Sequence, residues 1–315
     1  MTQNTNDFIS VHPLDPDDAQ LVAGMRVMVA PAKGVSRGVE GWGQFDAFMA
    51  SVLAPNNMKS EVDTIGGVPG TWVRPANELL GCALLHLHGG WFNFGSANAF
   101  ANFVGQIAVR IGVRAFIPDY RLAPEHPFPA ATEDVWACYR GLAQKGYRRI
   151  VLTGDSAGGN LALGLAGRIV EASGLPHAEL AGVAVFSPVT DLALSGESYE
   201  TRADADPLFT RAQVAQLVQT YLGDSDPKGP LTSPLAGPVA GLPPVRVHVG
   251  DDEVLLDDAR RYVAKAIAAD VDAKLDIWMG MPHGVVGRVG TLKAADQAMD
   301  AVGVFLANRL RVASA

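Results

Sequence analysis

Residues 149–167 read RIVLTGDSAGGNLALGLAG. The letters RIVLT predict a buried strand, and the Ala- and Leu-rich residues 156–172 predict a helix. Between them, GDSAG fits the pattern Gly-x-Ser-x-Gly, in which a strained turn between strand and helix exposes a serine hydroxyl above a sheet. The glycines belong to this turn because larger side chains would collide there. The pattern predicts Ser156 as a nucleophile at a helix N-terminus, where N–H groups and the helix dipole favour negative charge.

A second match to this pattern, GVSRG at residues 34–38, lacks the same context. It follows APAK and leads into VEGWGQ, so no strand is predicted before it. Gly-rich chains produce such matches by chance, and this chain contains 34 glycines. The context therefore selects Ser156 over Ser36.

Strand-like and helix-like segments alternate on both sides of the turn. The nearly all-apolar run LAGVAVF at 180–186 is typical of a parallel strand covered on both faces. The alternation predicts an α/β fold with a mostly parallel central sheet flanked by helices. The predicted strands are 82–88, 113–118, 149–153, 180–186, 245–250 and 273–279, and the predicted helices are 97–112, 130–145, 156–172, 257–269 and 293–312.

Two regions interrupt the alternation. The first looks helical and supplies no strand; the second inserts more than 50 residues between two strands and contains a predicted helix at 211–222. By length alone, 315 residues predict about two domains. Long insertions in compact folds are often functional, so we expect one catalytic core with a helical cap instead. The expected division is residues 1–55 (cap), 56–187 (core), 188–240 (cap insert) and 241–315 (core).

Composition narrows the class of protein. The chain is 48% hydrophobic and 18% charged, as expected for a globular protein with a large core. Its net charge is −8 and it has no basic block, so we expect no nucleic-acid or membrane partner. Cys82 and Cys138 lie in apolar segments, as buried thiols of a reducing compartment do. The start MTQNTNDFIS lacks a signal-peptide pattern, and no apolar stretch is long enough to span a bilayer. We therefore predict a cytoplasmic protein.

A serine nucleophile needs a general base, which near neutral pH is usually histidine. With this turn the chain order is serine, acid, histidine. His177 follows Ser156 too closely, and His248 falls inside a strand as core histidines do. His283 follows the strand 273–279 in the loop GMPHG and is the predicted base. The order excludes the histidines that precede the serine, which are His12, His86, His88 and His126.

The acid must lie between the serine and the histidine, at the end of a strand. The strand 245–250 ends directly in Asp251, Asp252 and Glu253. One of these three should orient the imidazole and stabilise the imidazolium. The residues alone leave the choice among them open.

A metal-dependent hydrolase is a competing hypothesis. His86 and His88 alternate along a strand and so share one face. No further ligand cluster follows with suitable spacing, so we expect neither a metal nor another cofactor.

Four motifs together resemble those of the hormone-sensitive-lipase-type esterases of the α/β-hydrolase superfamily. The resemblance covers residues 80–290 and implies the α/β-hydrolase fold, a cap from the two irregular regions and carboxylesterase activity. In that family the acid is followed by Leu two residues on and Asp four residues on. Glu253 fits this spacing and Asp252 does not. The motifs are HGG at 88–90, DYRLAPEHPFPAA at 119–131, GDSAGGN at 154–160, and residues 253–257 with His283.

The family motif usually reads HGGG, and this chain has Trp91 in place of the third glycine. Because an oxyanion hole uses backbone N–H groups, the resemblance implies Gly89, Gly90 and Ala157 as donors, with Trp91 as a further candidate. Aromatic residues near the motif and in the cap predict a small apolar pocket for short or medium acyl esters. The predicted pocket residues are Trp91, Phe92, Phe94, Phe209 and Tyr221.

The segment 119–131 carries no evident chemistry, and we expect Asp119 and Arg121 to pair beneath the site. The expected partner is a small-molecule ester. A receptor-like protein without catalysis is one alternative, because plant gibberellin receptors share the fold but lack the histidine; His283 favours an enzyme. Lactone or amide hydrolysis is another alternative. A homodimer occurs in similar proteins, and no residue here decides that point.

Overall fold

The computed structural model describes residues 8–35, 41–172 and 178–311. Its central sheet has nine strands in the order β1-β9-β8-β7-β6-β4-β5-β3-β2. The first seven strands in this order, from β1 at the edge to β5, are parallel to one another. Strand β3 pairs antiparallel with β5, and β2 pairs antiparallel with β3 at the other edge. The predicted α/β fold with a mostly parallel sheet is confirmed. The strands are β1 (Ile9–His12), β2 (Met58–Ile65), β3 (Val68–Pro75), β4 (Cys82–Leu87), β5 (Ala115–Pro118), β6 (Arg149–Asp155), β7 (Glu179–Phe186), β8 (Val245–Gly250) and β9 (Ala273–Trp278).

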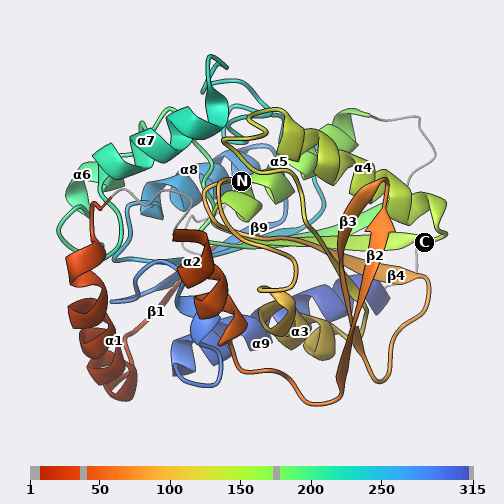
Figure 1. Ribbon diagram of the computed structural model, residues 1–315, viewed down its shortest axis with the longest axis horizontal. Helices are drawn as coiled ribbons and strands as arrows, with labels where there is room; N and C mark the ends of the chain where they lie inside the picture. The colour runs from red at the N-terminus through yellow and green to blue at the C-terminus, as the bar shows by residue number, and fades with distance from the viewer. Residues whose placement is uncertain (1–7, 36–40, 173–177, 312–315) are drawn as a thin grey trace.

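Helices cover both faces of this sheet (Figure 1). Helices α3 and α9 lie on one face, and α4, α5 and α8 lie on the other. The shorter helices α6 and α7 and the N-terminal helices α1 and α2 lie toward one end of the sheet. The helices are α1 (Pro16–Val29), η2 (Ala30–Ala32), α2 (Gly41–Ala50), α3 (Ala101–Ile111), α4 (Ala130–Gln144), α5 (Ala157–Glu171), α6 (Ser198–Thr201), α7 (Arg211–Leu222), α8 (Leu256–Ala268), η3 (Val285–Arg288) and α9 (Lys293–Arg311).

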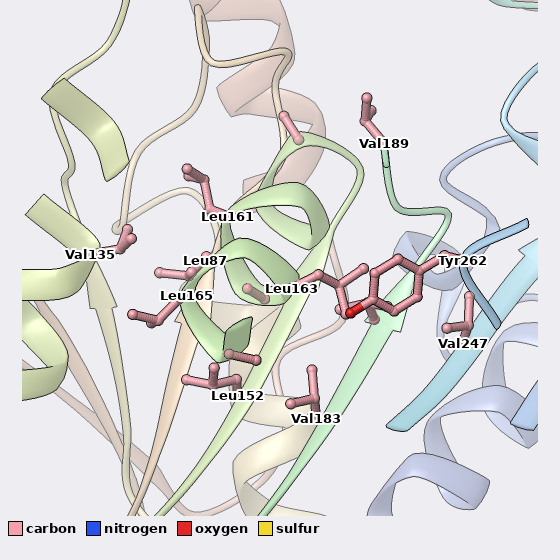
Figure 2. Packing of buried hydrophobic residues seen from close by; sticks show 14 of the residues in the cluster. Leu87, Val135, Leu152, Leu161, Leu163, Leu165, Val183, Val189, Val247 and Tyr262 are labelled. Carbon is pink, nitrogen blue, oxygen red and sulfur yellow. The ribbon is translucent and has the colours of Figure 1, made fainter. Parts of the chain in front are cut away.

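The core between α5 and the sheet holds the strand that leads to Ser156. Leu152 of β6 and Val183 of β7 lie under Leu161 and Leu165 of α5 (Figure 2), and all four side chains are buried. Burying such a side chain stabilises a fold by about 1.5–3 kcal/mol. This packing holds β6 and α5 in one orientation and so defines the turn between them.

The expectation that residues 1–55 contain no strand is wrong. Strand β1 pairs in parallel with β9, with Ile9 opposite Leu275 and His12 opposite Trp278. The His12 ring stacks on Trp278 at 3.9 Å, and its Nε2 lies 2.8 Å from Asp276 Oδ1. A four-residue edge strand has too few residues for a clear period, which is why the pattern missed it.

A hairpin also precedes the predicted alternation. Strands β2 and β3 pair along their whole length, joined by Gly66 and Gly67, which have φ of 63° and 87°. Two consecutive positive φ angles are what a tight hairpin turn requires and what glycine adopts readily. The hairpin places β3 beside β5 and completes the sheet.

Some expectations fall on residues that the structure does not describe. These are Ser36, Arg37 and Gly38 of the second G-x-S-x-G match, His177, and the last residue of the helix predicted at 293–312. Across the described ranges 8–35, 41–172 and 178–311, no helix combines the length and the apolar character needed to cross a membrane.

Candidate active site

Ser156 stands in the turn between β6 and α5, the context that its motif predicts. Its φ of 54° and ψ of −120° are rare for a residue with a side chain and are typical of strained functional turns. The Ser156 N–H donates to the Phe186 carbonyl at the end of β7, at 2.8 Å. The side chain is 4% exposed. The turn therefore holds one serine at the carboxyl end of the sheet and at the N-terminus of α5.

The two motif glycines are required by close backbone contacts. A Cβ on Gly154 would stand 2.3 Å from the Gly158 carbonyl oxygen. A Cβ on Gly158 would stand 1.9 Å from the Leu87 carbonyl oxygen at the end of β4. Both neighbours are backbone atoms, which cannot move aside as a side-chain tip can. The glycines thus let α5 start directly against two strands.

We expect Gly158→Ala to lower the free energy of unfolding by at least about 3 kcal/mol, because the new methyl group overlaps the Leu87 backbone. Gly164→Ala in the same helix is the matched control. Its nearest neighbour would be Pro234 Cγ at 3.9 Å, so the gain in helix propensity should make it neutral or stabilising. Urea unfolding of both variants measures the difference. Equal stability of the two would contradict this account of the turn.

His283 and Glu253 contact each other across two loops. His283 follows β9, Glu253 follows β8, and His283 Nδ1 lies 2.7 Å from Glu253 Oε2. The Glu253 side chain is fully buried. Its other oxygen, Oε1, accepts hydrogen bonds from Ser187 Oγ and the Gly250 N–H, both at 2.7 Å. A carboxylate held on both oxygens in this way orients the imidazole that it contacts.

The electrostatic environment of His283 favours its protonated form. Burial by itself lowers the pKa of His283, but the charge of Glu253 and the hydrogen bond to it outweigh burial. Asp206 and Asp155 add smaller contributions of the same sign. The result is a pKa raised above the ordinary value of 6.5. An imidazole in this environment is a stronger base than a free one.

The other two acids of this loop have different partners. Asp252 forms an ion pair with Arg26 of α1. Asp251 Oδ1 accepts the Gly280 N–H. Among the three acids that the residues left open, Glu253 is therefore the one whose carboxylate contacts His283.

Ser156 and His283 line one cavity with a volume of about 440 Å³. Its walls come from the N-terminal helices α1 and α2, the segment 207–217 of the insert, and η3. Of the predicted pocket residues, Trp91, Phe94 and Phe209 line it. The cavity also includes the aromatic side chains of Phe45, Phe48, Phe103 and Phe186.

The prediction that Phe92 and Tyr221 line the pocket is wrong. Their rings stack on each other at 3.8 Å and are fully buried outside the cavity wall. Trp91 and Phe92 are adjacent, with φ of 52° and 62°. Trp91 packs edge-on against Phe209 in the cavity wall, whereas Phe92 packs into the core.

The expected donor Gly89 is engaged elsewhere. Its N–H donates to Asp155 Oδ1 at 3.0 Å, so it is not free to bind an oxyanion. In contrast, the N–H groups of Gly90, Trp91 and Ala157 have no acceptor within the residues that the structure describes. The backbone at Trp91 adopts the positive φ that the third glycine of the family motif would adopt without strain.

Comparison with known proteins now places these features in a family. A family model described as alpha/beta hydrolase fold matches residues 84–287. An acetyl-hydrolase of Streptomyces hygroscopicus is 36% identical over 249 residues, which are 78% of this chain and 82% of that protein. A crystal structure of an esterase from the bacterial hormone-sensitive lipase family has a TM-score of 0.86 and 34% identity, over 94% of this chain and 99% of that one. The chain belongs to the hormone-sensitive-lipase-type carboxylesterases of the α/β-hydrolase superfamily.

Two further relatives agree with this assignment. The esterase LipU of Mycobacterium tuberculosis is 33% identical, over 82% of this chain and 86% of that protein. The esterase EstE5, in a crystal soaked with p-nitrophenyl butyrate, has a TM-score of 0.86 and 35% identity, over 95% of this chain and 100% of that one. This protein is therefore a carboxylesterase, as the motifs led us to expect.

The expected pair beneath the site of this esterase does not form. Arg121 instead pairs with Asp134 of α4, with its Nε and Nη2 both donating to the carboxylate. Asp119 accepts the Ala97 N–H at 2.6 Å. Each charged group therefore has a different partner, Arg121 in α4 and Asp119 in the segment before α3.

Three other histidines of the esterase, His86, His88 and His248, are buried and contact protein groups. His248 is buried, accepts a hydrogen bond from Trp278 Nε1, and has a pKa lowered to about 4 by burial. His86 Nδ1 contacts Thr153 Oγ1 at 2.8 Å, and His88 Nδ1 contacts the Gly89 carbonyl. Within the described residues, no three His, Cys, Asp or Glu side chains are grouped so that they could hold a metal.

The sequence analysis missed three residues that shape this site. Ser187 donates to Glu253, and Asp155 accepts from Gly89. Arg26 lines the cavity and joins α1 to the Ala205 carbonyl as well as to Asp252. Ser187 could have been found, because it directly follows β7 and active sites gather at the carboxyl ends of parallel strands. No sequence pattern marks Arg26, because its contacts lie 179 and 226 residues away.

Proposed function

We propose that this esterase hydrolyses short- to medium-chain carboxylic esters through an acyl-enzyme formed on Ser156. His283 acts as the general base, and Glu253 orients it. One observation carries the proposal: Ser156 and His283 line the same cavity, and His283 Nδ1 is held 2.7 Å from the buried Glu253 carboxylate. That contact leaves His283 Nε2 as the nitrogen that receives the serine proton.

The reaction follows from these contacts in two steps. Ser156 Oγ attacks the ester carbonyl while His283 takes its proton and then gives it to the leaving alcohol. His283 next takes a proton from water, whose hydroxide attacks the acyl-enzyme; as the bond to Ser156 Oγ breaks, His283 returns the proton to Oγ, and the carboxylic acid and free serine are released. The negative oxygen formed in each step is bound by the N–H groups of Gly90, Trp91 and Ala157, whose hydrogen atoms have no acceptor in the described residues. A donor of this kind contributes about 3–4 kcal/mol to the transition state.

Cavity size supports small substrates. About 440 Å³ lies in the lower half of the range of roughly 300–1,000 Å³ that ligand sites occupy. The rings of Trp91 and Phe209 narrow the space beside the catalytic residues. The similar esterase soaked with p-nitrophenyl butyrate is consistent with a short acyl chain.

We also propose that residues 1–55 and 188–240 form the cap of this enzyme over a core of residues 56–187 and 241–315. Met25 and Phe45 from the first region and Phe209 and Leu217 from the second line the cavity opposite the strand ends. Arg26 joins the two regions through the Ala205 carbonyl. The cap would therefore supply most of the surface that selects a substrate.

An acyl series of p-nitrophenyl esters tests the proposal. We expect kcat/KM to be highest for butyrate or hexanoate and to fall by about tenfold or more at dodecanoate, because a longer chain exceeds the space in a cavity of about 440 Å³. A γ-lactone and p-nitroacetanilide, measured in parallel, cover the lactone and amide alternatives. A higher kcat/KM on either of these, or no decrease at dodecanoate, would contradict the proposed substrate class.

A further inference from the structure

Four ionisable side chains line the cavity within the described residues: Arg26, Asp155, His283 and Arg288. Three of them have partners in the protein. Arg26 is paired with Asp252, and His283 with Glu253. Asp155 accepts the Gly89 N–H, and its Oδ1 lies 3.5 Å from His86 Nε2. Each of these three groups therefore has a polar partner in the protein before any substrate binds.

Arg288 is different. It ends η3, five residues after His283, and is half-buried. Within residues 8–35, 41–172 and 178–311, no carboxylate lies within ion-pair distance of its guanidinium, and its buried Nε has no hydrogen-bond partner. The guanidinium lies over the Phe48 ring of α2, with Cζ 4.6 Å from the ring centroid. Burial lowers the pKa of Arg288, as expected for a charge that has lost water without gaining a counter-charge.

An arginine in this situation has unused binding capacity. Stacking on an aromatic ring occupies a face of the planar guanidinium and leaves the N–H groups at its edge for a ligand. Those N–H groups match the two oxygens of a carboxylate. The wall nearby includes the apolar residues Phe45, Phe48 and Val286. A small molecule with one anionic group and an apolar body would satisfy both parts of the surface.

We propose that Arg288 is a specificity-determining residue that binds a carboxylate group carried by the ester substrate. This inference rests on the proposed function, because it assigns the substrate class of the same cavity. The natural substrate is then a small ester that bears one free carboxylate, either on its acyl part or on its alcohol part. The guanidinium does not contact the reacting atoms and acts by holding the substrate in the cavity.

Two substrate pairs distinguish the acyl from the alcohol position. In the acyl arm, monoethyl glutarate is compared with its neutral amide, ethyl glutaramate. In the alcohol arm, 3-acetoxypropanoate is compared with 3-acetoxypropanamide. Acid release is followed by pH-stat at constant ionic strength. We expect wild-type kcat/KM to be higher for the carboxylate than for the amide in one arm, and raised salt to lower this ratio.

Arg288→Gln should lower the carboxylate-to-amide ratio in that arm by about tenfold or more, mainly through KM. Arg288→Lys should retain part of the preference, since it keeps the charge but loses the planar fork. The matched control is Arg140→Gln, which removes the same charge from an exposed position on α4 outside the cavity wall. It should leave both ratios unchanged. Thermal unfolding checks that each variant is folded.

A measurement on the wild type alone covers the case in which Arg288 variants do not fold. Free glutarate should inhibit hydrolysis of p-nitrophenyl butyrate competitively and more strongly than its neutral diamide, glutaramide. The role of Arg288 would be overturned if the two inhibitors were equally strong and the carboxylate-to-amide ratio of kcat/KM were one or less in both arms. Hydrolysis of p-nitrophenyl butyrate in the same experiment would leave the proposed function intact. If no ester were hydrolysed, both proposals would be wrong.

Discussion

Replacing Ser156 with Ala is expected to lower kcat/KM for p-nitrophenyl butyrate by about 10,000-fold or more. The change removes the only atom that forms a bond to the substrate in the proposed mechanism. Binding and the oxyanion N–H groups remain, so a small residual rate above water should persist. The backbone at residue 156 keeps its unusual φ of 54° with either side chain, and Ser156 Oγ makes no hydrogen bond with the described residues. Stability should therefore change little.

The second serine in a G-x-S-x-G match supplies the control. Ser36→Ala removes the same hydroxyl oxygen from a serine in the same sequence pattern, but this copy of the pattern has no predicted strand before it. We expect its kcat/KM to stay within about twofold of wild type, since substitutions away from functional features are usually near neutral. Thermal unfolding of both variants separates loss of activity from loss of fold. A Ser156→Ala enzyme with near-normal turnover would exclude Ser156 as the nucleophile.

Glu253→Gln is expected to lower kcat/KM by about 1,000- to 10,000-fold through the tautomer of His283. Gly250 N–H and Ser187 Oγ–H both donate to Oε1, so a glutamine would place its carbonyl oxygen there. Its NH₂ group would then face His283 Nδ1 and donate to it. The imidazole proton would move to Nε2, which could no longer accept the serine proton. Removing one charge with no change of shape would thus disable the base.

Asp252→Asn tests the neighbouring acid with the same chemical change. Asp252 is paired with Arg26 rather than with His283, so we expect kcat/KM to fall by less than about tenfold. A larger loss for Asp252→Asn than for Glu253→Gln would show that Asp252 is the orienting acid.

The pH profile gives a second readout of the same contact. Only neutral His283 can accept a proton, so activity is low below its pKa and rises as pH increases through it. Because Glu253 raises that pKa, the wild-type midpoint of kcat/KM should lie above pH 6.5. In Glu253→Gln the charge is lost while burial still lowers the pKa, so the midpoint of the residual activity should move to lower pH. A midpoint that does not move would exclude Glu253 as the source of the shift.

Local patterns predicted the catalytic turn and most of the sheet. The strand before Ser156 and the helix after it are encoded in adjacent residues, and their period is visible without any long-range contact. The position of His283 followed from chain order and from the strand before it. Edge strand β1, which has four residues, and strand β2, which is mostly exposed, were missed because such strands lack a strong apolar period.

The contacts between distant residues could not be derived in this way. Three acids follow β8 in sequence, and the family spacing selected Glu253; the fold brings this one to His283 and gives Asp252 to Arg26. The same limit explains why Gly89 was wrongly predicted as an oxyanion donor: its N–H donates to Asp155, which lies at the end of another strand. A sequence motif states which atoms are near in the chain, and hydrogen bonds form between atoms that are near in space.

By itself, the sequence determined the α/β architecture, the family, and the candidate nucleophile and base, since each follows from neighbouring residues or from a regular period. Only the tertiary structure decided which N–H groups are unoccupied, which side chains line the cavity, and that Arg288 lies in its wall without a counter-charge among the described residues. The physical reason is that charge balance and burial depend on every element packed around a group. In this esterase those elements include α1, α2 and the insert, which are remote from the catalytic motifs in the chain.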